Sequence, residues 1–337
     1  MPTNKNNPTT MQALVLEAAN TPFKLASIER PVAGNGQVLV RIMASGVSPL
    51  DNKIRKGSAG HAKQPLPAVL GMDLAGLVEA TGPDVTAFQP GDEVYGMAGG
   101  VGGLQGTLAG YGVFDASLLA IKPANLTMRQ AATLPLNFIT AWEGLVDRAK
   151  VSGGQKVLIH GGAGGVGHIA IQIATAFGAE VFATGSAHQR KYIESLQATF
   201  LDYRTAVVAE YVNEYTGGEG FDIIYDTVGG ATLDASFASA RYYTGHVVSS
   251  LGWGEHKLAP LSFRGATYSG VFTLLPILTG RGREHHGEIM REATRLAEAG
   301  KLMPLVDERT FTLATAQQAH EILEYGKAIG KLVVDIP

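Results

Sequence analysis

The sequence contains no cysteine among its 337 residues. This excludes disulfides, thiolate metal sites and cysteine nucleophiles, and it fits an intracellular protein. No apolar run approaches the ~18–20 residues of a membrane span, and the polar, Asn-rich residues 1–10 lack the apolar core of a signal peptide. The formal net charge of −3 gives no sign of a basic surface for nucleic acid or anionic lipid. We therefore expect a cytoplasmic protein that binds neither nucleic acid nor membrane, with a disordered tail over residues 1–10.

Glycine, by contrast, is abundant, with 43 residues that follow no regular period. So many glycines indicate numerous tight turns and close approaches of the backbone. A chain of 337 residues is longer than a single core usually organises, so two domains are expected. The hydrophobic fraction of 45% and charged fraction of 17% are ordinary for a well-buried globular protein.

The first third of the chain reads as a compact, mostly antiparallel β unit, because short apolar runs such as residues 37–43 are separated by Gly, Pro and Asp. After residue 127, strand-like runs alternate with helix-like stretches, which is typical of a doubly wound parallel sheet. The strand-like runs are residues 156–160, 180–184, 221–225, 246–250 and 267–272. Amphipathic helices at 283–300 and 315–325 and a strand at 330–335 close the chain and are assigned to the β unit.

The strongest motif is Gly162-x-Gly164-x-x-Gly167, which follows the apolar run 156–160 and opens a helix-like stretch. In that context Gly162 permits a tight turn, Gly164 lets the backbone approach a pyrophosphate, and Gly167 lets the helix pack against the strand. The free amides and the helix dipole then face the phosphates. The motif predicts a bound dinucleotide rather than a merely tight turn, with Gly165 and Val166 as further contacts.

A second glycine-rich stretch, residues 99–106, lacks this context because it follows no parallel strand and opens no helix. Two interpretations remain open for it, a mobile surface loop and a lid beside the active site.

The residues after the second predicted strand indicate which dinucleotide is bound. An NAD-binding domain usually carries Asp or Glu about 20 residues beyond the first glycine, for the ribose 2′-hydroxyl. Here that region offers hydroxyls at Thr184 and Ser186 and positive charge at Arg190 and Lys191, with no carboxylate at the strand end. A 2′-phosphate prefers such surroundings, and one charge-assisted contact is worth ~1.5–3 kcal/mol. NADPH is therefore predicted over NADH, the alternative being that Arg190 and Lys191 merely begin a solvated helix.

Six motifs in a fixed order support a wider resemblance. They are Ala44-Ser-Gly-Val-Ser-Pro-Leu-Asp51, Leu70-Gly-Met-Asp-Leu-Ala-Gly76, Pro90-Gly-Asp-Glu-Val94, Ala131-Ala-Thr-Leu-Pro135, the glycine motif and Asp226-Thr-Val-Gly-Gly230. In this order they resemble the medium-chain dehydrogenase/reductase superfamily, in its zinc-free quinone oxidoreductase branch, over nearly the whole chain after the tail.

The resemblance implies an α/β fold in which a Rossmann domain is inserted into a GroES-like, mostly-β catalytic domain. The Rossmann domain would span residues 127–276, and the catalytic domain residues 11–126 and 277–337. The active site would lie in the cleft between them. The resemblance also implies a homodimer in which the edge strand at residues 267–272 pairs across subunits.

Two positions depart from the zinc-dependent alcohol dehydrogenases of this superfamily. Where those enzymes place a Cys and a His on the catalytic zinc, this chain has Ser48 and Met72, and neither a hydroxyl nor a thioether is a competent ligand in such a site. The four-Cys structural zinc lobe is also impossible without cysteine. No metal is therefore expected. The adjacent His285 and His286 would point to different faces of a helix, and both are expected to be exposed.

A site without zinc lacks the Lewis acid that polarises an alcohol or ketone. Such a site favours quinones and conjugated enals or enones, so the resemblance implies an NADPH-dependent oxidoreductase that transfers hydride to a small-molecule quinone or α,β-unsaturated carbonyl. It places Ser48, Asp51 and Lys53 beside the nicotinamide. We expect Lys53 to hold the nicotinamide ribose or the substrate oxygen and Asp51 to orient Lys53. The alternative is a surface Lys–Asp pair worth under ~1 kcal/mol.

The remaining cofactor contacts are implied by the same resemblance. Thr140 should approach the nicotinamide, and Tyr203 should lie near the adenosine end. The carboxamide pocket should be lined by backbone at Val228, Ser250, Leu251, Gly252, Phe272 and Thr273. A competing function, since folds do not dictate activity, is an NADPH-binding protein that senses or binds with little turnover.

Overall fold

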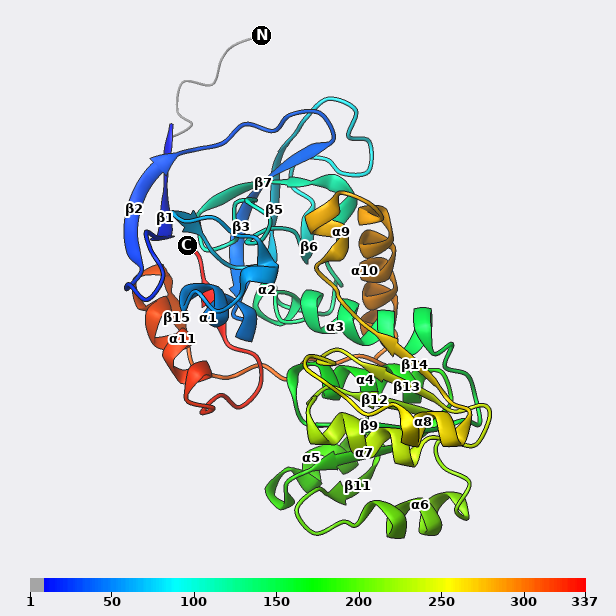
Figure 1. The fold of residues 1–337 in the computed structure, drawn as a ribbon. Coiled ribbons are helices and arrows are strands. Elements are labelled where there is room, and N and C mark those ends of the chain that lie inside the picture. The colour runs from blue at the N-terminus through cyan, green and yellow to red at the C-terminus, as the bar shows by residue number, and fades with distance from the viewer. Residues whose placement is uncertain (1–8) are drawn as a thin grey trace. The chain divides into compact units, whose positions relative to one another are not determined.

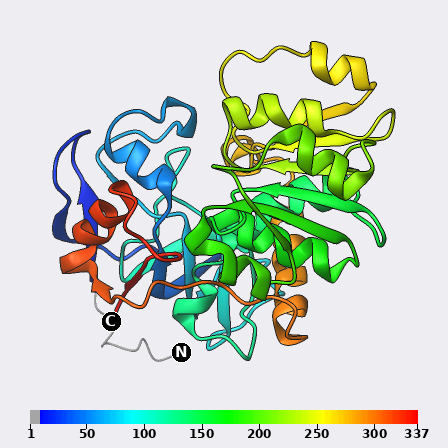
Figure 2. The same cartoon turned by 90° about the horizontal axis from the view of Figure 1, so that it is seen from below.

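A computed structural model describes residues 9–337 and divides the chain into two compact units (Figures 1 and 2). The first unit runs to Leu136 and resumes over Leu274–Glu298 and Pro304–Pro337, and the second comprises Asn137–Thr273 and Ala299–Met303. Most of the predicted disordered tail, residues 1–8, lies outside the described residues. Thr10, the last residue assigned to that tail, already begins the first strand, so this end of the prediction is wrong by one residue.

The first unit is built on antiparallel strands, as the sequence predicted. One path of strands runs β15-β16-β3-β5-β6-β8, with β7 also paired to β3, and a smaller sheet has the order β2-β1-β4. Every pair within these sheets is antiparallel except β15 with β16. The strands are β1 (Thr10–Leu16), β2 (Lys24–Glu29), β3 (Gln37–Gly46), β4 (Ala68–Val69), β5 (Asp73–Thr81), β6 (Glu93–Met97), β7 (Tyr111–Asp115), β8 (Leu119–Ile121), β15 (Phe311–Thr312) and β16 (Val333–Asp335).

Within the described residues, five α-helices belong to the first unit, and a sixth, α3 (Pro135–Trp142), leads out of it into the second. The five are α1 (Pro49–Arg55), α2 (Met128–Ala131), α9 (Leu275–Thr279), α10 (Arg283–Glu298) and α11 (Ala316–Glu324). Helix α1 follows β3 directly. Ser48, in an extended conformation, is its N-cap, and Pro49 occupies the first helical position, where its missing N–H costs nothing.

The second unit contains a six-stranded sheet of order β11-β10-β9-β12-β13-β14, in which all pairs are parallel. The strand order reverses between β9 and β12, so the sheet is doubly wound and of the Rossmann type, as predicted. The strands are β9 (Lys156–His160), β10 (Glu180–Gly185), β11 (Thr199–Asp202), β12 (Ile223–Asp226), β13 (His246–Ser249) and β14 (Thr267–Gly270). The helices are α4 (Gly165–Ala176), α5 (Arg190–Ser195), α6 (Val208–Thr216), α7 (Ala231–Ser239) and α8 (Ala259–Arg264), after a π-helical segment at Glu143–Arg148.

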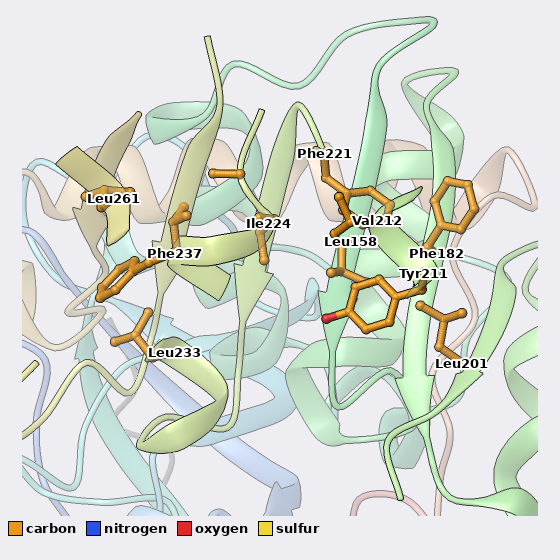
Figure 3. Close-up of a cluster of buried hydrophobic side chains, with 12 residues drawn as sticks. Leu158, Phe182, Leu201, Tyr211, Val212, Phe221, Ile224, Leu233, Phe237 and Leu261 are labelled. Carbon is orange, nitrogen blue, oxygen red and sulfur yellow. The ribbon is translucent and has the colours of Figure 1, made fainter. Parts of the chain in front are cut away.

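A hydrophobic cluster joins the sheet of the second unit to helices α6, α7 and α8 (Figure 3). Leu158 is the register partner of both Phe182 and Ile224, and Ile224 is the partner of Val247, so the four side chains form a row on one face of four neighbouring strands. Phe237 from α7 belongs to the same buried cluster. Because a parallel sheet is buried on both faces, its strands read as the continuous apolar runs seen in the sequence.

The boundaries between the units differ from those that the sequence suggested. The first unit extends to Leu136 rather than residue 126, because α2 packs against β3 and β5. It resumes at Leu274 rather than residue 277. Residues 299–303 belong to the second unit because Gln172 on α4 bonds both backbone groups of Met303, at 3.1 and 2.8 Å.

Burial bears on two further expectations. The glycine-rich stretch 99–106 is partly buried: Val101 is fully buried and a Cβ on Gly100 would lie 2.4 Å from the carbonyl oxygen of Gly71, whereas Gly102 and Gly103 are exposed. Its glycines therefore permit close packing of backbone on backbone. His286 is buried within α10, whereas its neighbour His285 is exposed and pairs with Glu288. The two histidines do point to different faces, but only one of them is solvated.

Candidate active site

The predicted phosphate-binding turn lies between β9 and α4. Gly164 is the N-cap of α4, and the first amides of a helix have no acceptor within it. Gly164 and Gly165 are exposed, and Val166 is half-buried. The turn is held by Thr184 at the end of β10, whose carbonyl accepts from Gly162 N at 2.8 Å. These backbone groups are thus oriented by the protein itself, with the helix N-terminus open to solvent.

The glycines of the turn meet different requirements, and one of them differs from the prediction. The left-handed residue is Gly161, with φ of +74°, so the tight turn depends on Gly161 rather than Gly162. Gly162 is required because a Cβ there would lie 2.7 Å from Cβ of Ala183. Gly167 packs directly on Gly161. Around Gly164, in contrast, the nearest atom to an added Cβ is the Gly161 carbonyl oxygen at 3.1 Å. This open side fits a pyrophosphate approaching the backbone.

Thr184 and Ser186 face inward rather than toward solvent. The Thr184 hydroxyl accepts from Gly161 N at 3.1 Å and lies 3.3 Å from Nδ1 of His160. Burial lowers the pKa of His160 to about 4, so this histidine is neutral and packs beneath the turn. The Ser186 hydroxyl bonds Gln189 Oε1 at 2.9 Å, as part of a capping box. Both hydroxyls therefore shape the loop that a ribose would contact.

Positive charge gathers at the ends of β10 and β11. Arg190 is exposed, pairs with Glu194 at 3.3 Å and lies over the Phe200 ring at 4.4 Å. Tyr203 is 58% exposed just after β11, and its backbone N–H donates to Gly185 O at 3.2 Å. The guanidinium of Arg204 lies against Tyr203, with Nε 3.4 Å from the phenol oxygen. Arg204 was not predicted, because it follows β11, whereas the sequence pattern for the ribose site covers only the residues that follow β10.

The carboxyl ends of β12 and β13 are tied together by Asp226, a residue of the Asp226–Gly230 motif for which the sequence predicted no role. This buried carboxylate accepts from Val228 N at 3.1 Å, Gly229 N at 3.0 Å and the Ser249 hydroxyl at 2.7 Å. Ser250 N donates to the Asp226 carbonyl at 3.2 Å. The predicted carboxamide-pocket residues Val228 and Ser250 are thus held side by side at the edge of the sheet where ligands bind in such folds.

The hydroxyls of Thr140 and Thr273 lie 2.9 Å apart. Thr140 belongs to α3, and Thr273 is the last residue of the segment Asn137–Thr273. The backbone carbonyl of Thr140 accepts from the buried Tyr225 hydroxyl at 2.6 Å. Gly252 is a close approach, since a Cβ there would lie 2.1 Å from the Tyr268 hydroxyl. Other predicted members lie next to these: Leu251 follows Ser250, and Phe272 stacks edge-on against Trp253 at 6.3 Å.

Helix α1 and its N-cap Ser48 include the three predicted catalytic residues, which lie in different surroundings. Ser48 and Asp51 are buried, whereas Lys53 is exposed. The Asp51 carboxylate accepts from Ser48 N at 2.8 Å rather than pairing with Lys53. Residues two apart on a helix do not face each other, so the expectation that Asp51 orients Lys53 is wrong. The surface-pair alternative is wrong for the same reason.

Asp51 instead belongs to a buried polar cluster. We call it the Lys331 cluster and define it as Ser48, Asp51, Asp73 and Lys331. All four are at most 8% exposed. The Lys331 ammonium lies 2.5 Å from the Ser48 hydroxyl and 3.1 Å from Asp73 Oδ2. Asp73 Oδ1 also accepts from Leu136 N at 2.9 Å, at the start of α3. No sequence signal pointed to Lys331, since 283 residues separate it from Ser48.

Two carboxyl groups share one ammonium in the Lys331 cluster. The pKa of Asp51 is raised to about 7, chiefly by burial and in part by the nearby Asp73, while the Ser48 amide and Lys331 oppose the shift. Burial also raises the pKa of Asp73, against the effect of Lys331 and the Leu136 amide. Because like charges in a buried site disfavour each other, the cluster retains a proton near neutral pH.

Among residues 9–337, no group of three or more His, Asp or Glu side chains is arranged to hold a metal ion. The places that zinc enzymes of the resembled superfamily use for metal ligands hold Ser48 and Met72, both fully buried. In the same described range, no helix is both long enough and apolar enough to cross a membrane.

Two family models match the chain. Residues 34–124 match the alcohol dehydrogenase GroES-like domain, and residues 197–334 match the zinc-binding dehydrogenase family. A 2-methylene-furan-3-one reductase of Solanum lycopersicum is 33% identical over 317 residues, which cover 92% of this chain and 74% of the reductase. The chain spans only 13% of the length of another relative, a spectinabilin polyketide synthase system protein of Streptomyces orinoci, at 33% identity.

Solved structures give the same assignment. An alcohol dehydrogenase superfamily protein from Novosphingobium aromaticivorans is 56% identical, with a TM-score of 0.95 and coverage of 97% of this chain and 100% of that one. A quinone oxidoreductase from Coxiella burnetii is 29% identical, with a TM-score of 0.82 and the same coverage. These similarities extend over both units.

Proposed function

This chain belongs to the medium-chain dehydrogenase/reductase superfamily, and from that premise we propose that it is an NADPH-dependent reductase of quinones or α,β-unsaturated carbonyls that needs no metal. The superfamily is one of nicotinamide-dependent oxidoreductases, so oxidoreductase chemistry follows from membership. The acceptor class is supported by relatives whose names specify an enone-type substrate and a quinone.

The observation that carries this proposal is the turn between β9 and α4. Its amides are held in place by Thr184, the first helical amides lack internal acceptors, and the side of Gly164 is open. The pyrophosphate of the cofactor would rest on these amides. The loops after β12 and β13, joined by Asp226, and the Thr140–Thr273 pair would contact the nicotinamide end.

The preference for NADPH is supported by charge. Arg190 and Arg204 flank the end of the β10–β11 pair, and each is exposed enough to turn toward a 2′-phosphate. Arg190 would exchange its solvated Glu194 partner for the phosphate, because an exposed ion pair is worth only about 0–1 kcal/mol. Tyr203, beside Arg204, would pack against the adenosine moiety.

The bound cofactor supplies a hydride to the electrophilic carbon of the acceptor. The chain's own residues then have to hold the acceptor and stabilise the oxygen that becomes negatively charged. Lys53, exposed on α1, can donate a hydrogen bond to that oxygen or to the nicotinamide ribose. Ser48 and Asp51 act from within the Lys331 cluster.

The test is NADPH oxidation by the purified protein with a panel of quinones, enals and enones. Steady turnover with at least one acceptor, and a higher kcat/KM for NADPH than for NADH, is the expected result. Tight NADPH binding without turnover on any acceptor would instead favour a binding or sensing role. Absence of binding to either reduced nucleotide would overturn both.

We also propose a homodimer in which β14 pairs with its counterpart in a second copy. Strand β14 is the edge of the parallel sheet, so one row of its backbone groups has no partner strand among residues 9–337. Exposed apolar side chains gather in the segments next to it, with Phe263 83%, Leu258 54% and Trp253 52% exposed.

A further inference from the structure

The hydroxyl of Tyr225 joins α3 to the loop after β13. Tyr225 is the last residue but one of β12 and is fully buried, and its hydroxyl donates to the backbone carbonyl of Thr140 on α3 at 2.6 Å. The side chain of Ser250, just after β13, hydrogen-bonds the same hydroxyl. We infer that Tyr225 is a positioning residue that holds Thr140 and Ser250 in place for the nicotinamide end of the cofactor. This inference rests on the proposed function and adds a residue to it.

The place of Tyr225 follows from the topology of the second unit, to which all three residues belong. Strands β9 and β12 are neighbours, and the strand order reverses between them. In doubly wound sheets, ligands bind beyond the carboxyl ends of the strands at such a reversal. The open turn after β9 and the loops after β12 and β13 all lie at these ends. Because the side chain of Tyr225 is buried, it can act on a ligand only through its neighbours.

The segment that follows α3 leaves room for the tyrosine ring. Gly144 has no side chain, and a Cβ there would lie 2.7 Å from Cζ and 2.9 Å from the hydroxyl oxygen of Tyr225. Gly144 belongs to the π-helical segment Glu143–Arg148, and its carbonyl accepts from Ala149 N, five residues on, at 3.0 Å. Turns of this kind are rare and recur at functional sites. Glycine at position 144 therefore lets the hydroxyl come close enough to bond the backbone of Thr140.

The hydrogen-bond directions at Tyr225 are fixed by its partners. Burial raises the pKa of Tyr225 well above its usual range, and Glu143 adds to this shift while Ser250 opposes it. The phenol is therefore protonated at neutral pH. A backbone carbonyl can only accept, so the single phenol proton goes to Thr140, and the phenol oxygen accepts from the Ser250 hydroxyl. One oxygen atom thus bonds both segments at once.

The two tethered residues connect further to groups that the proposed cofactor would contact. The Thr140 hydroxyl lies 2.9 Å from that of Thr273, and Ser250 N donates to the Asp226 carbonyl at 3.2 Å. Removing the phenol oxygen takes one partner from a buried carbonyl and one from a hydroxyl, so both segments are free to shift. A misplacement of about 1 Å in groups that orient a reactant can cost ~10²-fold in rate. The adenosine end, at the turn after β9, would not be disturbed.

The test compares Tyr225→Phe with the wild-type protein on two ligands. One is NADPH, and the other is 2′-phospho-ADP-ribose, which is NADPH without its nicotinamide ring. Tyr225→Phe should raise the Kd for NADPH about fivefold and lower kcat with a reactive acceptor by roughly tenfold to a hundredfold. The Kd for 2′-phospho-ADP-ribose should change less than about twofold. A merely structural role would weaken the binding of both ligands or of neither, as calorimetric titration would measure.

Tyr211→Phe is the matched control, because Tyr211 is another buried tyrosine of the second unit and its hydroxyl bonds the Ser239 side chain. It should lower thermal stability and leave both dissociation constants unchanged. If Tyr225→Phe does not fold, Gly144→Ala decides, since it keeps the hydroxyl but displaces the ring, and it must weaken NADPH binding alone. If neither variant folds, the contact serves the fold as a whole and the inference is overturned.

Equal weakening of the two ligands in Tyr225→Phe, or wild-type affinity and kcat in that variant, would also overturn the inference. Failure of the proposed function looks different, because the wild-type protein would then bind NADPH without reducing any acceptor. The two dissociation constants would still test the role of Tyr225.

Discussion

A Cβ at position 167 would lie 2.0 Å from the carbonyl oxygen of Gly161, a separation that no pair of such atoms sustains. Gly167 is therefore required by the packing of α4 on the preceding turn. Gly164, earlier in the same motif, has no such internal requirement, since only one atom comes within 4 Å of its added Cβ, at 3.1 Å. The two glycines of one motif thus serve folding and ligand binding separately.

This separation predicts opposite outcomes for two alanine substitutions. Gly167→Ala should lower the melting temperature of the protein without cofactor by several degrees, because overpacking costs roughly 1–3 kcal/mol. Gly164→Ala should leave that melting temperature within a degree or two but weaken NADPH binding at least tenfold. Thermal unfolding and fluorescence titration with NADPH measure the two effects. Equal NADPH affinity in Gly164→Ala and wild type would contradict the assigned pyrophosphate site.

Arg190 and Arg204 should each contribute to nucleotide selectivity. A charge-assisted hydrogen bond is worth ~1.5–3 kcal/mol, so Arg190→Ala or Arg204→Ala should reduce the ratio of NADPH to NADH kcat/KM by about tenfold to a hundredfold. Arg241→Ala is the control, since Arg241 is an exposed arginine of the same unit that pairs with Asp222. An unchanged ratio in both test variants would show that neither arginine contacts the 2′-phosphate.

Lys53 should act on the substrate or the nicotinamide ribose. Lys53→Ala should lower kcat/KM about tenfold or more for the acceptor that the wild-type enzyme reduces best, as expected for a lost hydrogen bond to charged oxygen. Lys56, exposed at the end of the same helix and paired with Glu324, offers a control at which alanine should change turnover little. Near-normal turnover of Lys53→Ala with every quinone and enone tested would remove Lys53 from the mechanism.

Asp51 should make the protein less stable as the pH rises. Its pKa of about 7 in the fold exceeds its ordinary value of 3.8, so the folded protein binds more protons than the unfolded chain between these values. The stabilisation is complete below pH ~4 and is lost as the pH rises through 7. Lys331 and Asp73 are the charged groups that act on Asp51, while His320 and Glu324 on α11 contact Asn52 and Arg55 on α1.

Asp51→Asn should therefore flatten the fall in unfolding free energy between pH 5 and 8, as urea titrations at several pH values would measure. Asp307 gives the opposite case, since its hydrogen bond to Arg309 lowers its pKa to about 2 and its contribution is lost only as the pH falls through that value. Asp307→Asn should destabilise the protein at neutral pH and leave the slope between pH 5 and 8 intact. An identical slope in Asp51→Asn would contradict the buried proton.

The outer edge of β14 should be needed for the homodimer. Thr267 N donates to Gly245 O, just before β13, and Val271 N donates to Ser249 O at its end, so by alternation the N–H groups of Tyr268 and Gly270 face away from β13. Gly270→Pro removes one outward N–H and leaves the bonds to β13, and the space around Gly270 is open to 3.8 Å. This variant should be monomeric by light scattering with near-normal secondary structure. A dimer of unchanged affinity would place the interface elsewhere.

The sequence by itself determined the features that are local in the chain. The Gly162–Gly167 motif identifies its own turn because a strand, the turn and a helix N-terminus are consecutive, and each glycine acts on atoms a few residues away. The parallel sheet was recognisable because strands buried on both faces are continuously apolar. Strand β11 and helices α6–α8 were not recognisable from the sequence, because their apolar residues come together only in the folded cluster of Figure 3.

Only the tertiary structure decided the surroundings of the polar residues. Asp51 and Lys53 are neighbours in sequence, yet helix geometry buries one and exposes the other. Arg204 reaches the end of β10 because β11 pairs with that strand, and Lys331 reaches Ser48 because β16 pairs with β3. Hydrogen bonds and charge interactions act over a few ångströms of space, and the pairing of strands far apart in the chain sets which groups come within that range.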